Sequence, residues 1–198
     1  MDFEAEVTRL MAEWKKTGGS AKIAQALGDL YAAAEDHSAA LTWYQTAIRL
    51  AVGDSELLDK LEDCAIRGFE KLIAREESTN NRQAHTLKQT YLSFRIASHE
   101  RRVKARPLDG QLHYQLAKTY YLGNMTDLAI PEFTVALQHE QSRSSSYFYL
   151  ARCFMRERRF EEALLHFSMI EESVLSGDIR EDIRYHKSKC LGELGRSG

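Results

Sequence analysis

The sequence predicts an all-α protein built from repeated pairs of helices, and three observations support this fold class. Only two prolines occur among 198 residues, so little interrupts long helices. The good helix formers Leu, Ala, Glu, Arg and Lys dominate the composition. Residues of matching size also recur at an offset of 34 residues, which indicates a repeated structural unit.

The period is clearest between the segments that begin at Gln111 and Ser146. At this offset, small residues align with small residues and aromatic residues align with aromatic residues. The aligned pairs are Leu116 and Leu150, Ala117 and Ala151, Tyr120 and Phe154, Ala129 and Ala163, and Phe133 and Phe167.

Within the first of these segments, the pattern predicts a helix from Gln111 to Leu122 and a second helix that continues to about Gln138. Gly123 and Asn124 separate the two helices, because both residues tolerate a positive φ. Asp127 is the expected N-terminal cap of the second helix. The unit is therefore a helix, a tight turn and a helix.

An earlier copy reads "ALGDLYAAAEDHSAALTWYQTAIRL" and carries Gly28, Tyr31, Ala40, Tyr44 and Ala47 at the key positions. This pattern resembles the tetratricopeptide repeat (TPR) family, whose unit is a 34-residue helix-turn-helix. The resemblance implies a right-handed superhelical array of antiparallel helix pairs, a TPR-like α-solenoid. It also implies that the first helix of each pair, helix A, lines a concave side, and the second helix, helix B, a convex side.

The remaining segments complete the array. An amphipathic helix with Phe3 and Trp14 precedes the first repeat and ends at Gly18. Two long helices, separated by a polar turn at 78–81, fill the middle. Near the C-terminus, three extra residues are expected around "EESVLSGD". The predicted organisation is a capping helix (1–20), a TPR repeat (21–54), an elongated TPR-like helix pair (55–109), two TPR repeats (110–143 and 144–180) and a C-terminal helix (181–198) that is either a partial repeat or a solvating cap.

Charge and composition exclude several classes of partner. The formal net charge is −2, without the basic domain typical of nucleic-acid binding, so no nucleic-acid partner is expected. No apolar run reaches the ~18 residues needed to cross a bilayer, so no membrane insertion is expected. The acidic start is unlike a secretory signal, and three cysteines without CxxC spacing fit a reducing compartment. The expected location is the cytoplasm.

No catalytic, cofactor or metal motif is found, so the protein is predicted not to be an enzyme and to need no cofactor. Cys153 has His166 nearby in the sequence, but Cys153 and Cys190 occupy equivalent repeat positions. Both are therefore expected to be buried, unreactive thiols. His113 lies on a predicted core face, whereas His99 lies in a charged helix and is expected to be exposed.

The A helices of the three C-terminal copies carry two rows of equivalent residues on the face away from the core. The aromatic row is Tyr114, Phe148 and Tyr185, and the basic row, one turn further on, is Lys118, Arg152 and Lys189. Tyr121 and Arg156 lie close to them. In TPR proteins, such positions line the groove that holds peptides. The predicted partner-binding residues are Tyr114, Lys118, Tyr121, Phe148, Arg152, Arg156, Tyr185 and Lys189.

Two functions remain open from the sequence. The first is a non-catalytic TPR scaffold or adaptor that binds a peptide or protein segment of acidic or aromatic-acidic character. The second is a self-associating array that forms homo-oligomers through its terminal helices, with Ile183, Cys190, Leu191 and Leu194 as an open apolar surface. A clamp for chaperone C-terminal tails is not expected, because the first repeat has Gln25 and Asp29 where that clamp needs a lysine and an asparagine.

Overall fold

The computed structural model describes residues 2–79, 81–170 and 177–195. These residues form helices joined by short turns, which confirms the all-α prediction. None of the described helices is both long and apolar enough to cross a membrane. In chain order the helices are α1 (Phe3–Thr17), α2 (Ala21–Ala33), α3 (His37–Leu50), α4 (Ser55–Thr79), α5 (Asn81–Ala105), α6 (Gly110–Leu122), α7 (Thr126–Ala136), α8 (Glu140–Arg156), α9 (Phe160–Ser168) and α10 (Gly177–Glu193).

The helices belong to two compact units, Met1–Tyr91 and Leu92–Gly198, called here the N-terminal unit and the C-terminal unit. The division falls inside α5. The predicted pair at 55–109 does contain two long helices of 25 residues each, but its second helix is shared between the units. α8 begins at Glu140, four residues before the predicted boundary at 144. The boundaries of the repeats stay a prediction. The segment 171–178, where three inserted residues were expected, lies largely outside the described part of the chain.

In the N-terminal unit, α1 covers one side of α2 and α3. Asp2 caps α1 through its side chain, and Gly18 ends the helix at a φ of 77°. Leu10 of α1 packs against Ile23 and Leu27 of α2. The indole rings of Trp14 and Trp43 meet edge to face, with centroids 5.3 Å apart. The amphipathic start thus buries its apolar face on the first helix pair.

The first helix pair depends on a close approach between Gly28 of α2 and Tyr44 of α3. A Cβ atom at Gly28 would lie 2.7 Å from the Tyr44 ring, which only glycine avoids. The Tyr44 hydroxyl donates a hydrogen bond of 2.7 Å to Asp29, and Lys60 of α4 also binds this carboxylate at 2.9 Å. The contacts of Tyr44 with Gly28 and Asp29, and of Lys60 with Asp29, therefore join α2, α3 and α4.

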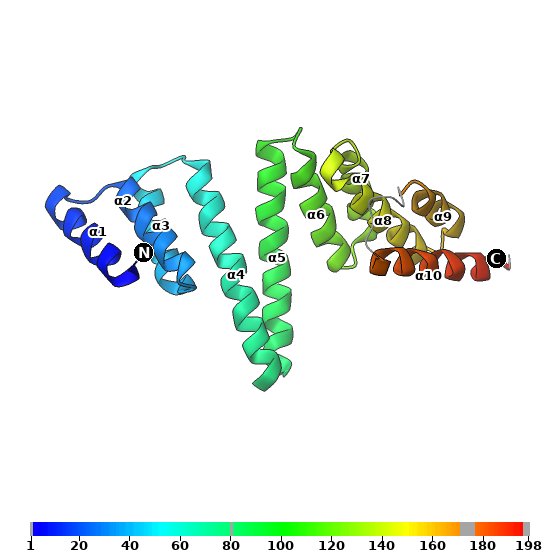
Figure 1. Cartoon of the computed structure of the whole chain (residues 1–198), viewed down its shortest axis with the longest axis horizontal. Helices are drawn as coiled ribbons and strands as arrows, with labels where there is room; N and C mark the ends of the chain where they lie inside the picture. The colour runs from blue at the N-terminus through cyan, green and yellow to red at the C-terminus, as the bar shows by residue number, and fades with distance from the viewer. Residues whose placement is uncertain (1, 80, 171–176, 196–198) are drawn as a thin grey trace. The chain divides into compact units, whose positions relative to one another are not determined.

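The C-terminal unit contains two antiparallel helix pairs, α6 with α7 and α8 with α9, followed by α10 (Figure 1). Its core is formed by the small and aromatic residues that recur at the 34-residue period. Phe133 and Phe167 are buried beside four alanines, so the helix backbones approach closely while the rings fill the adjoining space. The alanines, all without exposed surface, are Ala117, Ala129, Ala151 and Ala163.

Two details of the turns differ from the prediction. Asn124 adopts a φ of 60°, whereas Gly123 has an ordinary φ of −78°. Asp127 does not cap α7, because the helix begins at Thr126 and Met125 is its N-cap, without a side-chain hydrogen bond. Asp127 instead lies in the first turn, where a negative charge favours the helix dipole.

Burial corrects two expectations and confirms another. His99 is wrongly predicted to be exposed: it is buried, with Nδ1 2.9 Å from Thr119 Oγ1, because this part of α5 packs on α6. His113 is buried as predicted, between Glu132 and the carbonyl of Pro107. Ile183 and Cys190 of α10 are buried too, so they do not form the open apolar surface proposed for self-association.

Candidate functional site

Three A helices of the C-terminal unit carry the eight predicted partner-binding residues. α6 carries Tyr114, Lys118 and Tyr121, and α8 carries Phe148, Arg152 and Arg156. α10 carries Tyr185 and Lys189.

A pocket of about 440 Å³ lies among these helices and brings four of the eight residues together. The four are Tyr121, Arg152, Arg156 and Lys189. The sequence did not single out the five other lining residues, which are Met155, Arg158, Phe160, His186 and Glu193. We call this space the cationic pocket, because its lining includes Arg152, Arg156, Arg158 and Lys189.

Arg156 is held in a defined position by Tyr121. Its guanidinium carbon lies 3.7 Å from the centroid of the Tyr121 ring, and Nη1 donates a hydrogen bond of 2.7 Å to the Tyr121 carbonyl oxygen. The Tyr121 side chain is itself buried. The tyrosine is thus the support of the arginine, and Arg156 offers its charge with little freedom left to lose.

Two cations of the basic row, Arg152 and Lys118, lie over aromatic rings. The Arg152 guanidinium carbon is 5.5 Å from the Phe148 ring centroid and 5.8 Å from that of Tyr121. Lys118 Nζ lies 5.9 Å from the ring centroid of Tyr149. These cation–π contacts orient the cations without neutralising them, because a ring carries no net charge.

The aromatic row does not form a continuous lining. Tyr114 is half-buried against Phe133 and Tyr149, and burial raises the pKa of its hydroxyl. Tyr185 is largely exposed, and its ring contacts His186 edge to face. Tyr114, Lys118, Phe148 and Tyr185 are not among the residues that line the cationic pocket. Only part of the predicted surface is therefore gathered in one cavity.

His186 is the lining residue of the pocket that the sequence gave least reason to choose. Its ring lies parallel to Phe167 at a centroid distance of 6.0 Å, and Nε2 is 3.4 Å from Asp182. Within the described part of the chain, its buried Nδ1 has no hydrogen-bond partner. Burial lowers the His186 pKa, Asp182 opposes this shift, and Arg152 and Lys189 add to it. The one feature of the sequence that could have indicated His186 is its position one helical turn before Lys189.

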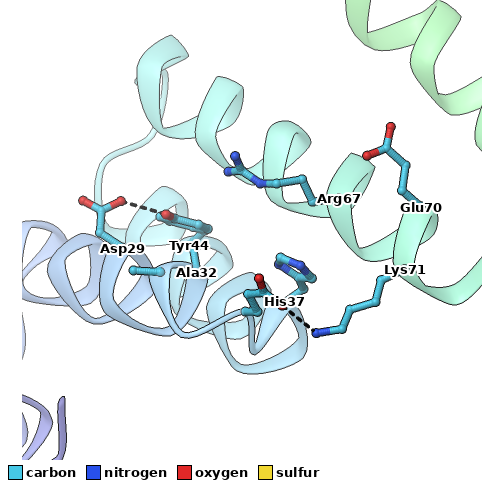
Figure 2. A pocket seen from close by; sticks show the side chains of 9 residues that line it. Asp29, Ala32, His37, Tyr44, Arg67, Glu70 and Lys71 are labelled. Carbon is cyan, nitrogen blue, oxygen red and sulfur yellow. Dashed lines mark hydrogen bonds and ion pairs between the residues drawn. The ribbon is translucent and has the colours of Figure 1, made fainter.

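A larger cavity of about 680 Å³ lies in the N-terminal unit, lined by α2, α3 and α4 (Figure 2). Its charges are balanced. Asp29 is paired with Lys60, Lys71 is paired with Glu35, and Arg67 lines the same wall of α4 as Glu70. The cationic pocket has one carboxylate against four cations and thus an excess of three positive charges. For an anionic ligand, the smaller cavity is the better candidate.

Two histidines should make the C-terminal unit sensitive to mild acid. The pKa of His166 is held below its ordinary value of 6.5, chiefly by burial, as is that of His186. Below about pH 6.5 the unfolded chain binds protons that the folded unit resists, so stability should fall as the pH drops from 7 towards 5.5. His166→Phe should reduce this pH dependence, measured by denaturant unfolding at each pH, because the ring already stacks on Phe154.

His85→Gln is the control for this prediction, because His85 is exposed in α5. It should leave the pH dependence of the C-terminal unit as it is in the wild type, because His85 lies in the N-terminal unit. If the free energy of unfolding of His166→Phe changes with pH as steeply as that of the wild type, protonation of His166 is not linked to unfolding.

Solved helical-repeat structures are similar to this chain. A crystal structure of MamA protein aligns with a TM-score of 0.60 at 15% identity, covering 88% of this chain and 82% of that chain. A structure described as MamA AMB-1 gives a TM-score of 0.62 at 14% identity, covering 90% and 87%. YrrB, described as a TPR protein with an unusual peptide-binding site, gives 0.61 at 17% identity, covering 94% and 84%.

No protein-family model matches the sequence, and no curated protein matches it significantly. The structural likeness, together with the size pattern and the packed helix pairs, confirms the fold that the sequence predicted. The chain has the helical-repeat fold of the tetratricopeptide repeat family.

Proposed function

We propose that this protein is a non-catalytic interaction module that binds an acidic segment of a partner protein along the A helices of its C-terminal unit. The observation that carries this proposal is the cationic pocket, in which four cations face a single carboxylate. An excess of positive charge within a cavity attracts an anion from solution and strengthens its hydrogen bonds once water is displaced.

The pocket also suits a peptide better than an isolated ion. Met155 and Phe160 place partly exposed apolar surface beside the cations, so an apolar or aromatic side chain next to an acidic one would find contacts. Arginine offers a planar fork that matches a carboxylate, and Lys189 adds a point charge. YrrB, a TPR protein with an unusual peptide-binding site, supports the same use of this fold.

The cysteines support a binding function rather than nucleophilic catalysis. Cys153 is fully buried, and burial raises its pKa to about 12, so the thiol stays protonated at neutral pH. Burial raises the pKa of Cys64 and Cys190 as well. All three thiols are free, which fits our proposal that the protein acts as a scaffold in the reducing cytoplasm.

Charge reversal across the A helices tests the proposal. The variant Lys118→Glu/Arg152→Glu/Lys189→Glu should bind the partner segment about 100-fold more weakly, because each charge-assisted hydrogen bond contributes ~1.5–3 kcal/mol. The partner would first be captured from lysate with the wild-type protein. Its binding segment would then be found on a peptide array, and affinity measured by fluorescence anisotropy with that labelled peptide.

A matched control changes the same number of charges elsewhere. Lys15, Lys16 and Lys22 are exposed in the N-terminal unit, and their triple Glu variant should bind like the wild type. Circular dichroism should show equal helicity for both variants. Equal affinity in the two variants would exclude the cationic pocket as the binding site. Recovery of more copies of this chain alone would favour self-association instead.

A further inference from the structure

We propose that the cationic pocket selects a dianionic oxyanion, namely a phosphorylated serine or threonine side chain on the partner segment, over a carboxylate. The inference rests on the proposed function and specifies the ligand of the same site. It draws on the charge count, on the unused donors and on the position of His186.

The charge count favours a dianion. The lining holds Arg152, Arg156, Arg158 and Lys189, and its single carboxylate, Glu193, lies 3.9 Å from Arg158. A carboxylate ligand would neutralise one of the three excess charges and leave two cations facing one another. A phosphate group carries nearly two negative charges at neutral pH and removes most of this repulsion.

The donors in the pocket outnumber what a carboxylate can accept. Arg156 gives one N–H to the Tyr121 carbonyl, and the structure shows no other hydrogen bond to this guanidinium among the described residues. Within the same part of the chain, Arg152 and Lys189 make no hydrogen bond or ion pair. A phosphate presents three strongly accepting oxygens, and clusters of arginines are a recurring means of binding it.

The arginines are already oriented for such a ligand. Stacking on Tyr121 fixes Arg156, and the rings of Phe148 and Tyr121 flank Arg152. Because these side chains are supported before binding, the ligand loses less affinity to their ordering. A volume of about 440 Å³ admits a side chain and its phosphate, not a folded element.

His186 reports on the anion from within the pocket. Arg152 of α8 and Lys189 of α10 face it with positive charge, Asp182 of α10 faces it with negative charge, and α9 contributes the uncharged ring of Phe167. A bound dianion would offset the two cations, so protonation of His186 should become easier. Binding of the dianion should therefore raise the His186 pKa.

The test compares three pools of labelled nine-residue peptides with randomised flanks, which differ only in the central residue. The central residue is phosphoserine, aspartate or serine, and inorganic phosphate is a fourth probe. By fluorescence anisotropy, the phosphoserine pool should bind about tenfold more tightly than the aspartate pool. An NMR titration of the His186 imidazole should show its pKa rise with the phosphoserine pool.

A conservative variant isolates the guanidinium fork. Arg152→Lys keeps the charge but removes the paired donors, so it should reduce the preference for phosphoserine over aspartate by several-fold. Arg49→Lys, at an exposed position of α3, is the matched control and should leave the preference unchanged.

Each outcome has a defined meaning. Equal binding of the aspartate and phosphoserine pools would overturn the phosphate inference and leave the proposed function standing. Binding of neither pool, with no shift at His186, would overturn both. If inorganic phosphate shifts His186 as strongly as the peptides do and neither pool gains affinity from its flanks, the site takes free phosphate, and the inference of a phosphorylated segment fails.

Discussion

Replacing Phe133 with alanine should lower the free energy of unfolding of the C-terminal unit by about 3–5 kcal/mol. The ring has no exposed surface, and it stacks on Tyr149 with centroids 5.4 Å apart and planes 1° from parallel. Tyr114 also contacts this ring, with centroids 6.0 Å apart. Truncation would leave a cavity between α6, α7 and α8 that the surrounding helices cannot close.

Hydrogen exchange can assign this loss to one unit. Amides of α6, α7 and α8 should lose protection, whereas amides of α2 and α3 should keep theirs, because those helices belong to the N-terminal unit. Val135→Ala is the control on the same helix, since this side chain is partly exposed, and it should cost under about 1 kcal/mol. A loss of similar size in both variants would show that Phe133 is not a core residue.

Tyr44→Ala should have an effect of comparable size, about 3–5 kcal/mol, on the N-terminal unit. The ring is 3% exposed and fills the space that Gly28 leaves. Its hydroxyl also binds Asp29, which Lys60 of α4 holds from the other side. The substitution therefore removes both a core ring and part of the link between α2, α3 and α4.

Tyr44→Phe separates these two contributions. It keeps the ring and removes the hydrogen bond to Asp29, whose carboxylate is partly exposed and retains Lys60, so the cost should be only about 1 kcal/mol. Urea unfolding followed by exchange of the α2 and α3 amides measures both variants. If Tyr44→Phe is as damaging as Tyr44→Ala, the hydroxyl rather than the ring dominates.

The fold could be predicted because the sizes of the core residues follow from their identities and recur at a fixed period along the sequence. Ala117 and Phe133 recur as Ala151 and Phe167, and each pair is buried as the period required. The residue that caps a helix depends on where the first helical turn begins, and the period does not fix that position to one residue. Asp127 was wrongly predicted as the cap, because the helix already begins at Thr126. Burial of His99 depended on which helix would cover it, which no periodicity states.

The candidate site was predictable only in part. Spacing placed Arg152 and Lys189 at equivalent positions of two helices and Arg156 at the edge of the same surface, and the pocket gathers all three. Spacing could not show that Tyr121 would be buried under Arg156, because that arrangement depends on the rotamer and on the distance between two helices. His186 and Arg158 enter the pocket through the packing of α10 and through the turn after α8.

The turn after α8 also bears on how this chain can evolve. Arg158 has a φ of 61°, a left-handed conformation that is strained for any residue with a Cβ atom and relaxed for glycine. Glu35, between α2 and α3, and Asn124, between α6 and α7, share this conformation. A glycine at position 158 would relax the backbone of this turn, but it would also remove one of the four positive charges that line the cationic pocket.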